Sequence, residues 1–245
     1  MSEWFGTWFD SEYYHSLYKD RDYTEAENFV QKLAEHLVPR ATDLILDLAC
    51  GKGRHSIHLN KMGYTVEGCD YSANSIKKAK ESENDKLHFY KHDMREPLPK
   101  KYDYILNLFT SFGYFNTEEE HLTTLTHLYN GLQDNGTLVI DYMNVDYVLN
   151  QLVHKETTMK DGIEFHIKRE LSDGKIVKHI AFEVEDGWHY HKEKVSALRL
   201  EDFTQWLEHV GFTLKEIFGD YNLGSFDTLS SPRLILVAQK WSINL

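Results

Sequence analysis

Short apolar runs alternate with helix-like segments between residues 43 and 142, and this alternation limits the fold more than any other feature of the sequence. The first run, Leu44 to Leu48, is typical of a strand that is buried on both faces. Further strands are expected at residues 64–69, 87–91, 102–108 and 136–142, with helices at 54–62, 73–83 and 117–131. This order predicts a doubly wound, mostly parallel α/β sheet with helices on both faces.

The pattern changes after residue 154. Two stretches, residues 163–171 and 176–184, alternate apolar and polar side chains, and each is followed by a turn signal, Asp173-Gly174 or Asp186-Gly187. We therefore expect a three-stranded antiparallel β-meander at residues 155–199, inserted into an α/β domain. That domain consists of residues 1–154 and 200–245, where a helix at 201–210 and strands at 212–218 and 234–238 complete a seven-stranded sheet.

Charge and composition argue against several classes of partner. The chain of 245 residues has a formal net charge of −12, and because phosphate neutralisation requires clustered cations, we expect no nucleic-acid partner. No apolar run approaches the ~20 residues that cross a bilayer, and the acidic, aromatic start MSEWFGTWFD is unlike a secretory signal. The two cysteines, Cys50 and Cys69, form no disulfide framework, so the sequence favours a cytoplasmic location without membrane association.

The loop from Asp47 to Arg54 joins the first buried strand to a helix and contains Gly51 and Gly53. Glycine lets the backbone approach a ligand where a Cβ atom would collide with it. The helix that follows presents free N–H groups and the positive end of its dipole. Together these features predict a crevice for a nucleotide or another anionic group.

Polar residues end the next three strands. Asp70 closes the second strand, where a carboxylate can accept hydrogen bonds from both hydroxyls of a ribose. Asp93 closes the third strand, where it can accept a hydrogen bond from an adenine amino group, and Asn107 with Leu108 closes the fourth. Because the carboxyl ends of parallel strands meet at one edge of a sheet, we expect these residues to share one site.

Four segments carry a family resemblance: ILDLACGKGRHS, VEGCDYS, FYKHDMRE and YDYILNLFTSFGYF. They resemble the successive cofactor motifs of class I methyltransferases, which depend on S-adenosylmethionine (SAM). The resemblance covers residues 40–142 and the closing strands, and it implies a Rossmann-like fold with SAM as the cofactor. One departure is Ala49, which stands where the family usually has its first glycine, and a residue this small still permits the turn.

The resemblance also implies where the parts of SAM bind. The glycine loop meets the methionine part, and the position of Asp70 binds the ribose. Asp93 and Met94 flank the adenine, whereas Asn107 and Leu108 line the methionine and the transferred methyl group. The complete expected set is Tyr14, Asp47, Ala49, Gly51, Gly53, Arg54, Asp70, Tyr71, Ser72, Asp93, Met94, Asn107 and Leu108.

Aromatic residues are dense in residues 1–23 and again after the fourth strand. The first group either clasps the domain surface or forms a lid in which Tyr14 and Tyr18 close over SAM, as N-terminal segments do in related small-molecule methyltransferases. The second group either packs in the core or forms an aromatic wall that favours a methylated cation. Its members are Phe109, Phe112, Tyr114 and Phe115.

A general base is needed only if the methyl acceptor arrives protonated. The candidates are Tyr14, His15, His189 and His191, and the sequence does not choose among them. His189 and His191 share one face of an expected strand, but zinc requires a third protein ligand and none stands at a familiar spacing. We therefore expect no metal site.

The sequence predicts a SAM-dependent methyltransferase that acts on a nitrogen or oxygen of a small molecule, as a monomer or homodimer. Its insertion resembles the substrate-covering insertions of small-molecule methyltransferases, including those that act on amino sugars. Two alternatives stay open, a SAM-binding sensor or assembly module without turnover and a nicotinamide-dependent Rossmann oxidoreductase. The nicotinamide fingerprint Gly-x-Gly-x-x-Gly meets Ser56 at its third glycine.

Overall fold

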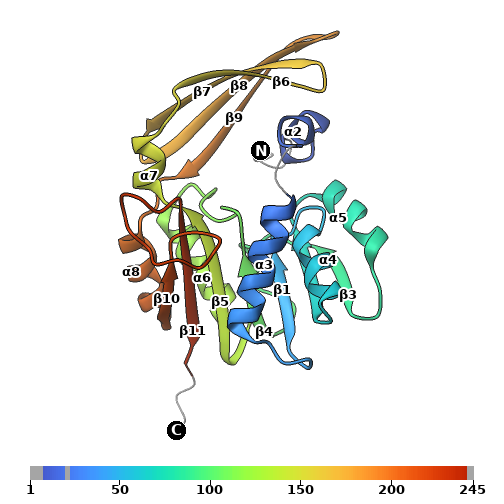
Figure 1. The fold of residues 1–245 in the computed structure, drawn as a ribbon, viewed down its shortest axis with the longest axis vertical. Helices are drawn as coiled ribbons and strands as arrows, with labels where there is room; N and C mark the ends of the chain where they lie inside the picture. Colours follow the sequence, from blue (N-terminus) through green and yellow to red (C-terminus); the bar gives the residue numbers. More distant parts are fainter. Residues whose placement is uncertain (1–7, 20–22, 242–245) are drawn as a thin grey trace.

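The computed structural model describes residues 8–19 and 23–241, which form two sheets (Figure 1). The larger sheet has seven strands in the order β10-β11-β5-β4-β1-β2-β3. Among these strands only β11 runs antiparallel to its neighbours, so the predicted mostly parallel, seven-stranded sheet is confirmed. The strands are β1 (Leu44–Leu48), β2 (Thr65–Asp70), β3 (Leu87–Lys91), β4 (Tyr102–Asn107), β5 (Leu132–Met143), β10 (Phe212–Phe218) and β11 (Arg233–Lys240).

Helices cover both faces of this sheet, because its strands carry apolar side chains on both faces. Ile45 of β1 packs in one hydrophobic cluster, whereas its neighbours Leu46 and Leu48 pack in another. The first cluster includes α3 (Tyr23–Leu37), α4 (Arg54–Lys61) and α5 (Ala73–Ala79), and the second includes α6 (Glu118–Asn130) and α8 (Leu200–Val210). The arrangement is doubly wound, as predicted. A short η1 (Lys80–Ser82) follows α5, and α7 (Val145–Asn150) leads to the second sheet.

The second sheet has four antiparallel strands, β6 (Lys155–Lys160), β7 (Ile163–Ser172), β8 (Lys175–Val184) and β9 (Gly187–Ser196). The prediction of a three-stranded meander is wrong, because the sheet has a fourth strand, β6, that the sequence pattern does not predict. This edge strand is mostly exposed and has one large apolar side chain, Met159, so it lacks an alternating pattern. Its hairpin turn has φ values of 50° at Asp161 and 79° at Gly162, as a type I′ turn requires. The turn between β8 and β9 lies one residue earlier than the predicted Asp186-Gly187 turn, because Gly187 is already paired with Val184 in the sheet.

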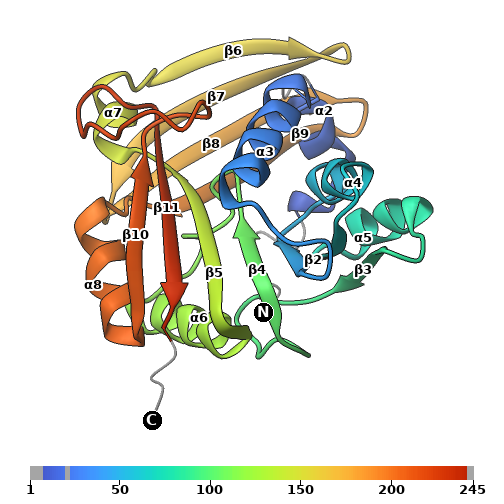
Figure 2. The ribbon, with the colours of Figure 1, turned by 60° about the horizontal axis from the view of Figure 1, so that its bottom comes forward.

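The N-terminal segment lies between the two sheets (Figures 1 and 2). It contains α2 (Glu12–Leu17), which begins after Ser11, whose Oγ accepts a hydrogen bond from the Tyr14 N–H at 3.1 Å. A third hydrophobic cluster joins Trp8 and Leu17 of this segment to Phe165, Ile167, Ile180 and Phe182 of the second sheet. The second sheet therefore covers the segment from above. No helix in the described ranges is long and apolar enough to cross a membrane.

Candidate active site

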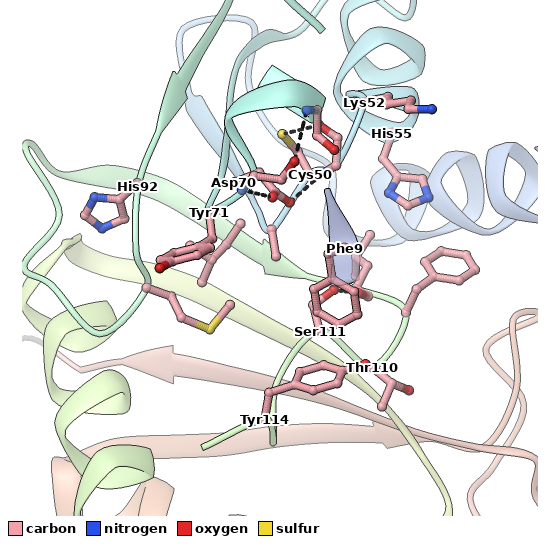
Figure 3. Close-up of a pocket in the computed structure, with 18 of the residues that line it drawn as sticks. Phe9, Cys50, Lys52, His55, Asp70, Tyr71, His92, Thr110, Ser111 and Tyr114 are labelled. Atoms are coloured by element: carbon pink, nitrogen blue, oxygen red, sulfur yellow. Dashed lines mark hydrogen bonds between the residues drawn. The ribbon is translucent and has the colours of Figure 1, made fainter. Parts of the chain in front are cut away.

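A cavity of about 410 Å³ lies at the carboxyl ends of β1, β2, β3 and β4, against the N-terminal segment. We call it the strand-end cavity. Its lining comes from the loop after β1, from the ends of the next three strands, and from residues 9–19. Figure 3 shows Asp70 beside Cys50 of the loop, whereas Phe9, Ser111 and Tyr114 lie together away from it. Open α/β sheets bind ligands in crevices at this edge.

The two glycines of the loop after β1 have different roles. Gly51 lines the cavity with a φ of 56°, and a Cβ atom at this position would meet no protein atom within 4 Å. Gly53 has a φ of 82°, and its Cβ atom would lie 2.6 Å from the ring of Phe89. Gly51 therefore leaves room for a ligand, whereas Gly53 allows close packing behind the cavity.

Asp70 fixes the glycine loop to the end of β2. Its Oδ2 accepts a hydrogen bond from the Gly51 N–H at 2.8 Å, and its Oδ1 accepts one from the Ser72 N–H at 2.8 Å. Burial raises the pKa of Asp70, against the effect of these hydrogen bonds. Because each carboxylate oxygen has a second lone pair, Asp70 can hold the loop and still accept hydroxyl hydrogen bonds from a ligand.

Asp47 lies behind the cavity. Its carboxylate is buried, and Oδ2 accepts hydrogen bonds from the Ser56 N–H at 3.1 Å and from the Ser56 hydroxyl at 2.6 Å. Burial raises the pKa of Asp47 to about 6 despite these hydrogen bonds. The residue orders the loop through the first turns of α4, and its ionisation at neutral pH costs folding free energy.

We expect the Asp47→Asn variant to gain stability relative to the wild type as the pH rises. The pKa of Asp47 in the folded protein lies above the ordinary value of 3.8 for an aspartate, so its stabilising contribution is present at low pH and is lost as the pH rises through about 6. Urea unfolding should show a variant advantage about 1 kcal/mol larger at pH 8 than at pH 5. An advantage of equal size at both pH values would contradict this account of the buried carboxylate.

The turn after β4 has a strained backbone that is held from behind. Phe109 and Thr110 have φ values of 57° and 60°, a left-handed conformation that is uncommon outside glycine. The Asp141 Oδ2 accepts a hydrogen bond from the Phe109 N–H at 2.7 Å, and its backbone oxygen accepts one from the Thr110 N–H at 2.9 Å. Arg233 pairs with the Asp141 carboxylate at 2.7 Å and donates to Thr110 Oγ1 at 3.0 Å. This buried pair fixes a turn whose side chains line the cavity.

The end of β3 supplies a carboxylate and an imidazole. Arg95 donates to both oxygens of Asp93, from Nε to Oδ1 at 3.0 Å and from Nη2 to Oδ2 at 2.6 Å. Burial opposes ionisation, but the hydrogen bonds and charge of Arg95 lower the pKa of Asp93 overall. His92 also lines the cavity, and its buried Nε2 has no hydrogen-bond partner among the described residues. A ligand in the cavity can provide that partner.

Aromatic side chains close another side of the cavity. The ring of Phe9 lies 5.0 Å from that of Tyr14 and 5.5 Å from that of Tyr114, measured between centroids. Tyr14 in turn lies 4.8 Å from Tyr18. The faces of such rings attract cations, so this wall suits a sulfonium or an ammonium group.

A family model described as a methyltransferase domain matches residues 40–205, which contain the glycine loop and the strand ends described above. The chain belongs to this methyltransferase family. The prediction of a class I SAM-dependent methyltransferase is confirmed, and the alternative of a nicotinamide-dependent oxidoreductase is wrong.

Known proteins resemble this methyltransferase in sequence and in fold. A glycine/sarcosine N-methyltransferase from Aphanothece halophytica is 28% identical over 208 residues, which cover 82% of this chain and 76% of that protein. A SAM-dependent methyltransferase from Clostridium acetobutylicum has the same fold, with a TM-score of 0.79 and 19% identity over 94% of this chain and 96% of that chain. SAM-bound CalS10, an amino pentose methyltransferase from Micromonospora echinaspora, gives a TM-score of 0.68 and 15% identity over 94% and 97% of the two chains.

Most of the residues that the sequence predicts for the cofactor site line the strand-end cavity in the structure. The lining includes Tyr14, Ala49, Gly51, Arg54, Asp70, Tyr71, Ser72, Asp93, Met94 and Leu108. Asp47, Gly53 and Asn107 are absent from the lining, and Asn107 is buried and donates from Nδ2 to the Leu48 carbonyl at 3.2 Å. These three residues support the lining from behind.

The four candidate bases separate into two pairs. Tyr14 and His15 line the strand-end cavity, whereas His189 and His191 do not. The ring of His191 stacks on Trp8 at 4.1 Å, and His189 contacts the Asp186 carboxylate at 2.8 Å through Nε2. The described residues contain no group of three or more His, Cys, Asp or Glu side chains that could hold a metal ion.

Several lining residues are missing from the expected cofactor set. Of the aromatic group after β4, Phe109, Tyr114 and Phe115 line the cavity, whereas Phe112 is fully buried in the core beside α6 and α8. Other lining residues that the sequence did not single out are Phe9, Lys19, Leu48, Cys50, Lys52, His55, Ser75, His92, Arg95, Thr110 and Ser111. Many of them adjoin a motif residue, and that adjacency is the only signal for them in the sequence. Trp4 and Phe5 of the N-terminal aromatic group lie outside the described residues.

Proposed function

We propose that this methyltransferase transfers the methyl group of SAM to the nitrogen of a small-molecule amine. The observation that carries the proposal is the similarity to a glycine/sarcosine N-methyltransferase across 82% of the chain. The rings of Phe9, Tyr14 and Tyr114 on the cavity lining support it, because their faces favour a methylated cation over a neutral product. Fold likeness to an amino pentose methyltransferase is consistent with a small acceptor that bears an amine.

The residues present fit SAM at the strand-end cavity. The volume of about 410 Å³ lies within the range of roughly 300–1,000 Å³ that is usual for ligand pockets. Gly51 leaves open space where a side chain would enter, and the buried Nε2 of His92 lacks a partner among the described residues. In this proposal the glycine loop holds the methionine part, Asp70 the ribose, and Asp93 with Met94 the adenine.

When bound, SAM supplies a methyl group on a positively charged sulfur, which is a good leaving group. The work left to the protein is to align the amine and to exclude water. Phe9, Tyr14 and Tyr114 form one side of the cavity and provide apolar surface for both tasks. The turn after β4, held by Asp141, keeps Thr110 and Ser111 at a fixed position on the lining.

An amine that arrives as an ammonium ion must lose a proton before it can attack. Of the four candidate bases, Tyr14 and His15 line the cavity, so we propose that the phenolate form of Tyr14 or the neutral imidazole of His15 receives the proton. His189 and His191 contact the N-terminal segment instead, and we assign them a packing role. In this proposal the insertion at residues 155–199 covers the acceptor side indirectly, by supporting the segment that lines the cavity.

A methyl-transfer assay tests the proposed function. Purified enzyme and SAM are incubated with matched acceptors, such as glycine against glycolate and an amino sugar against the corresponding hydroxyl sugar. We expect S-adenosylhomocysteine and a singly methylated product with an amine of the panel, and none with its hydroxyl counterpart. Methylation of the hydroxyl compounds alone would contradict N-methylation. SAM binding without turnover of any acceptor would favour a sensor.

A further inference from the structure

Glu193 of β9 accepts hydrogen bonds from two distant side chains. Its Oε1 accepts one from the Trp8 indole N–H at 2.7 Å, and its two oxygens lie 2.8 and 2.7 Å from the Tyr18 hydroxyl. Lys178 of β8, which pairs with Glu193 across the sheet, donates to the same hydroxyl at 2.6 Å and lies 4.4 Å above the Tyr18 ring. Glu193 does not line the strand-end cavity.

The two partners of Glu193 lie at opposite ends of the segment that closes the cavity. Trp8 stands directly before Phe9, and Tyr18 follows Tyr14 and His15 in the sequence. Phe9, Tyr14, His15 and Tyr18 line the strand-end cavity, whereas Trp8 does not. One carboxylate of the second sheet therefore fixes both ends of this closing segment, residues 8–18. The contacts span 185 and 175 residues of sequence.

Burial makes these contacts important for the position of the closing segment. The Trp8 side chain is only 1% exposed, so its indole N–H cannot be satisfied by water. A hydrogen bond to a carboxylate is stronger than one between neutral groups. Loss of Glu193 leaves a buried donor without its acceptor, and the segment can satisfy that donor only by moving away from the sheet.

We propose that Glu193 is a positioning residue that holds residues 8–18 closed over the strand-end cavity. The inference rests on the proposed function, since it requires that the cavity binds SAM and its demethylated product. The second sheet then controls ligand release through this one carboxylate. Lids of this kind set the rate of product release in many enzymes.

Release of S-adenosylhomocysteine, followed by stopped-flow displacement, tests the proposal. We expect Glu193→Ala to accelerate release at least about tenfold, because the charge-assisted hydrogen bonds that close the segment are lost. Glu193→Gln should show a smaller increase, since its amide oxygen can still accept one of them. Glu183→Gln is the matched control, because Glu183 is exposed on the neighbouring strand, and its release rate should equal that of the wild type.

A double-mutant cycle separates positioning from general destabilisation. Trp8→Phe keeps an aromatic ring against His191 but removes the indole donor, so it should also accelerate release. When combined with Glu193→Gln it should add less than its effect alone, because the two changes remove one interaction. If Glu193→Ala fails to fold, this cycle still decides the question.

Failure of the role proposed for Glu193 and failure of the proposed function give different experimental results. Release rates within about twofold of the wild type in Glu193→Gln and Trp8→Phe, or fully additive effects, would overturn the role of Glu193. A wild-type protein that binds neither SAM nor S-adenosylhomocysteine would overturn the proposed function instead.

Discussion

Replacement of Gly51 by valine should abolish SAM binding while the protein stays folded. The Cβ atom of Gly51 would meet no protein atom within 4 Å, so the added side chain enters the space that we assign to the cofactor. The backbone fixes the position of the Cβ atom, so a change of side-chain rotamer cannot relieve its collision with the ligand. We expect the affinity for SAM, measured by calorimetry, to fall at least ~100-fold, or about 2.7 kcal/mol.

Backbone strain is the competing explanation, and Gly63 provides the control for it. Gly51 has a φ of 56°, so valine there also costs roughly 1–3 kcal/mol of folding stability. Gly63 has a φ of 100°, and a Cβ atom there also meets no protein atom within 4 Å, but it does not line the cavity. Gly63→Val should therefore lose stability and keep SAM affinity. Tight SAM binding by a folded Gly51→Val protein would mean that the cofactor does not lie against this loop.

The second large effect is expected at Asp70. In the proposed complex Asp70 accepts two charge-assisted hydrogen bonds from the ribose, each worth roughly 1.5–3 kcal/mol, so we expect Asp70→Ala to lower the affinity for S-adenosylhomocysteine at least ~100-fold. Part of this loss arises through the loop, because the same carboxylate accepts the Gly51 and Ser72 N–H groups. Asp43→Asn is the comparison variant, since Asp43 is buried before β1, accepts a hydrogen bond from Arg40 and does not line the cavity, and its affinity should stay close to that of the wild type.

An analogue without ribose hydroxyls isolates the direct contribution of Asp70. The wild type should bind S-adenosylhomocysteine much more tightly than the analogue, and the Asp70→Ala variant should bind the two with similar affinity. A variant that keeps the full preference for the hydroxyls would assign the ribose to another residue, and Asp70 would then act on the loop alone.

The sequence predicted which residues meet at the strand-end cavity because each motif there depends on local chemistry. A buried strand, a glycine turn and a strand-end acid are each encoded within a few residues, and parallel strands bring such ends together. Gly51, Asp70 and Asp93 therefore reach the cavity as expected. The same local logic explains Asp47 and Gly53, which follow the motif but support the loop from behind.

The rest of the site depends on contacts between distant segments, which no local pattern encodes. The pairing of Trp8 with Glu193 spans 185 residues, and the left-handed turn at Phe109 and Thr110 is held by Asp141 on another strand. The histidine pair of β9 illustrates the limit. His189 and His191 do share one strand face, but that face meets the N-terminal segment instead of the cavity.

β6 was missed for a different physical reason. An edge strand whose side chains face solvent needs no apolar alternation, so its sequence, KETTMK, resembles a polar loop. Its pairing with β7 is carried by backbone hydrogen bonds and by the Asp161-Gly162 turn. An edge strand of this kind can be predicted from the sequence only when the strand that it pairs with is already known.

The most direct test of the central claim is a calorimetric titration of the wild-type protein with SAM. The account predicts binding of one SAM per chain at the strand-end cavity, competition by S-adenosylhomocysteine, and no heat of binding with nicotinamide dinucleotides. The absence of SAM binding by the folded protein, or binding that S-adenosylhomocysteine does not displace, would contradict it.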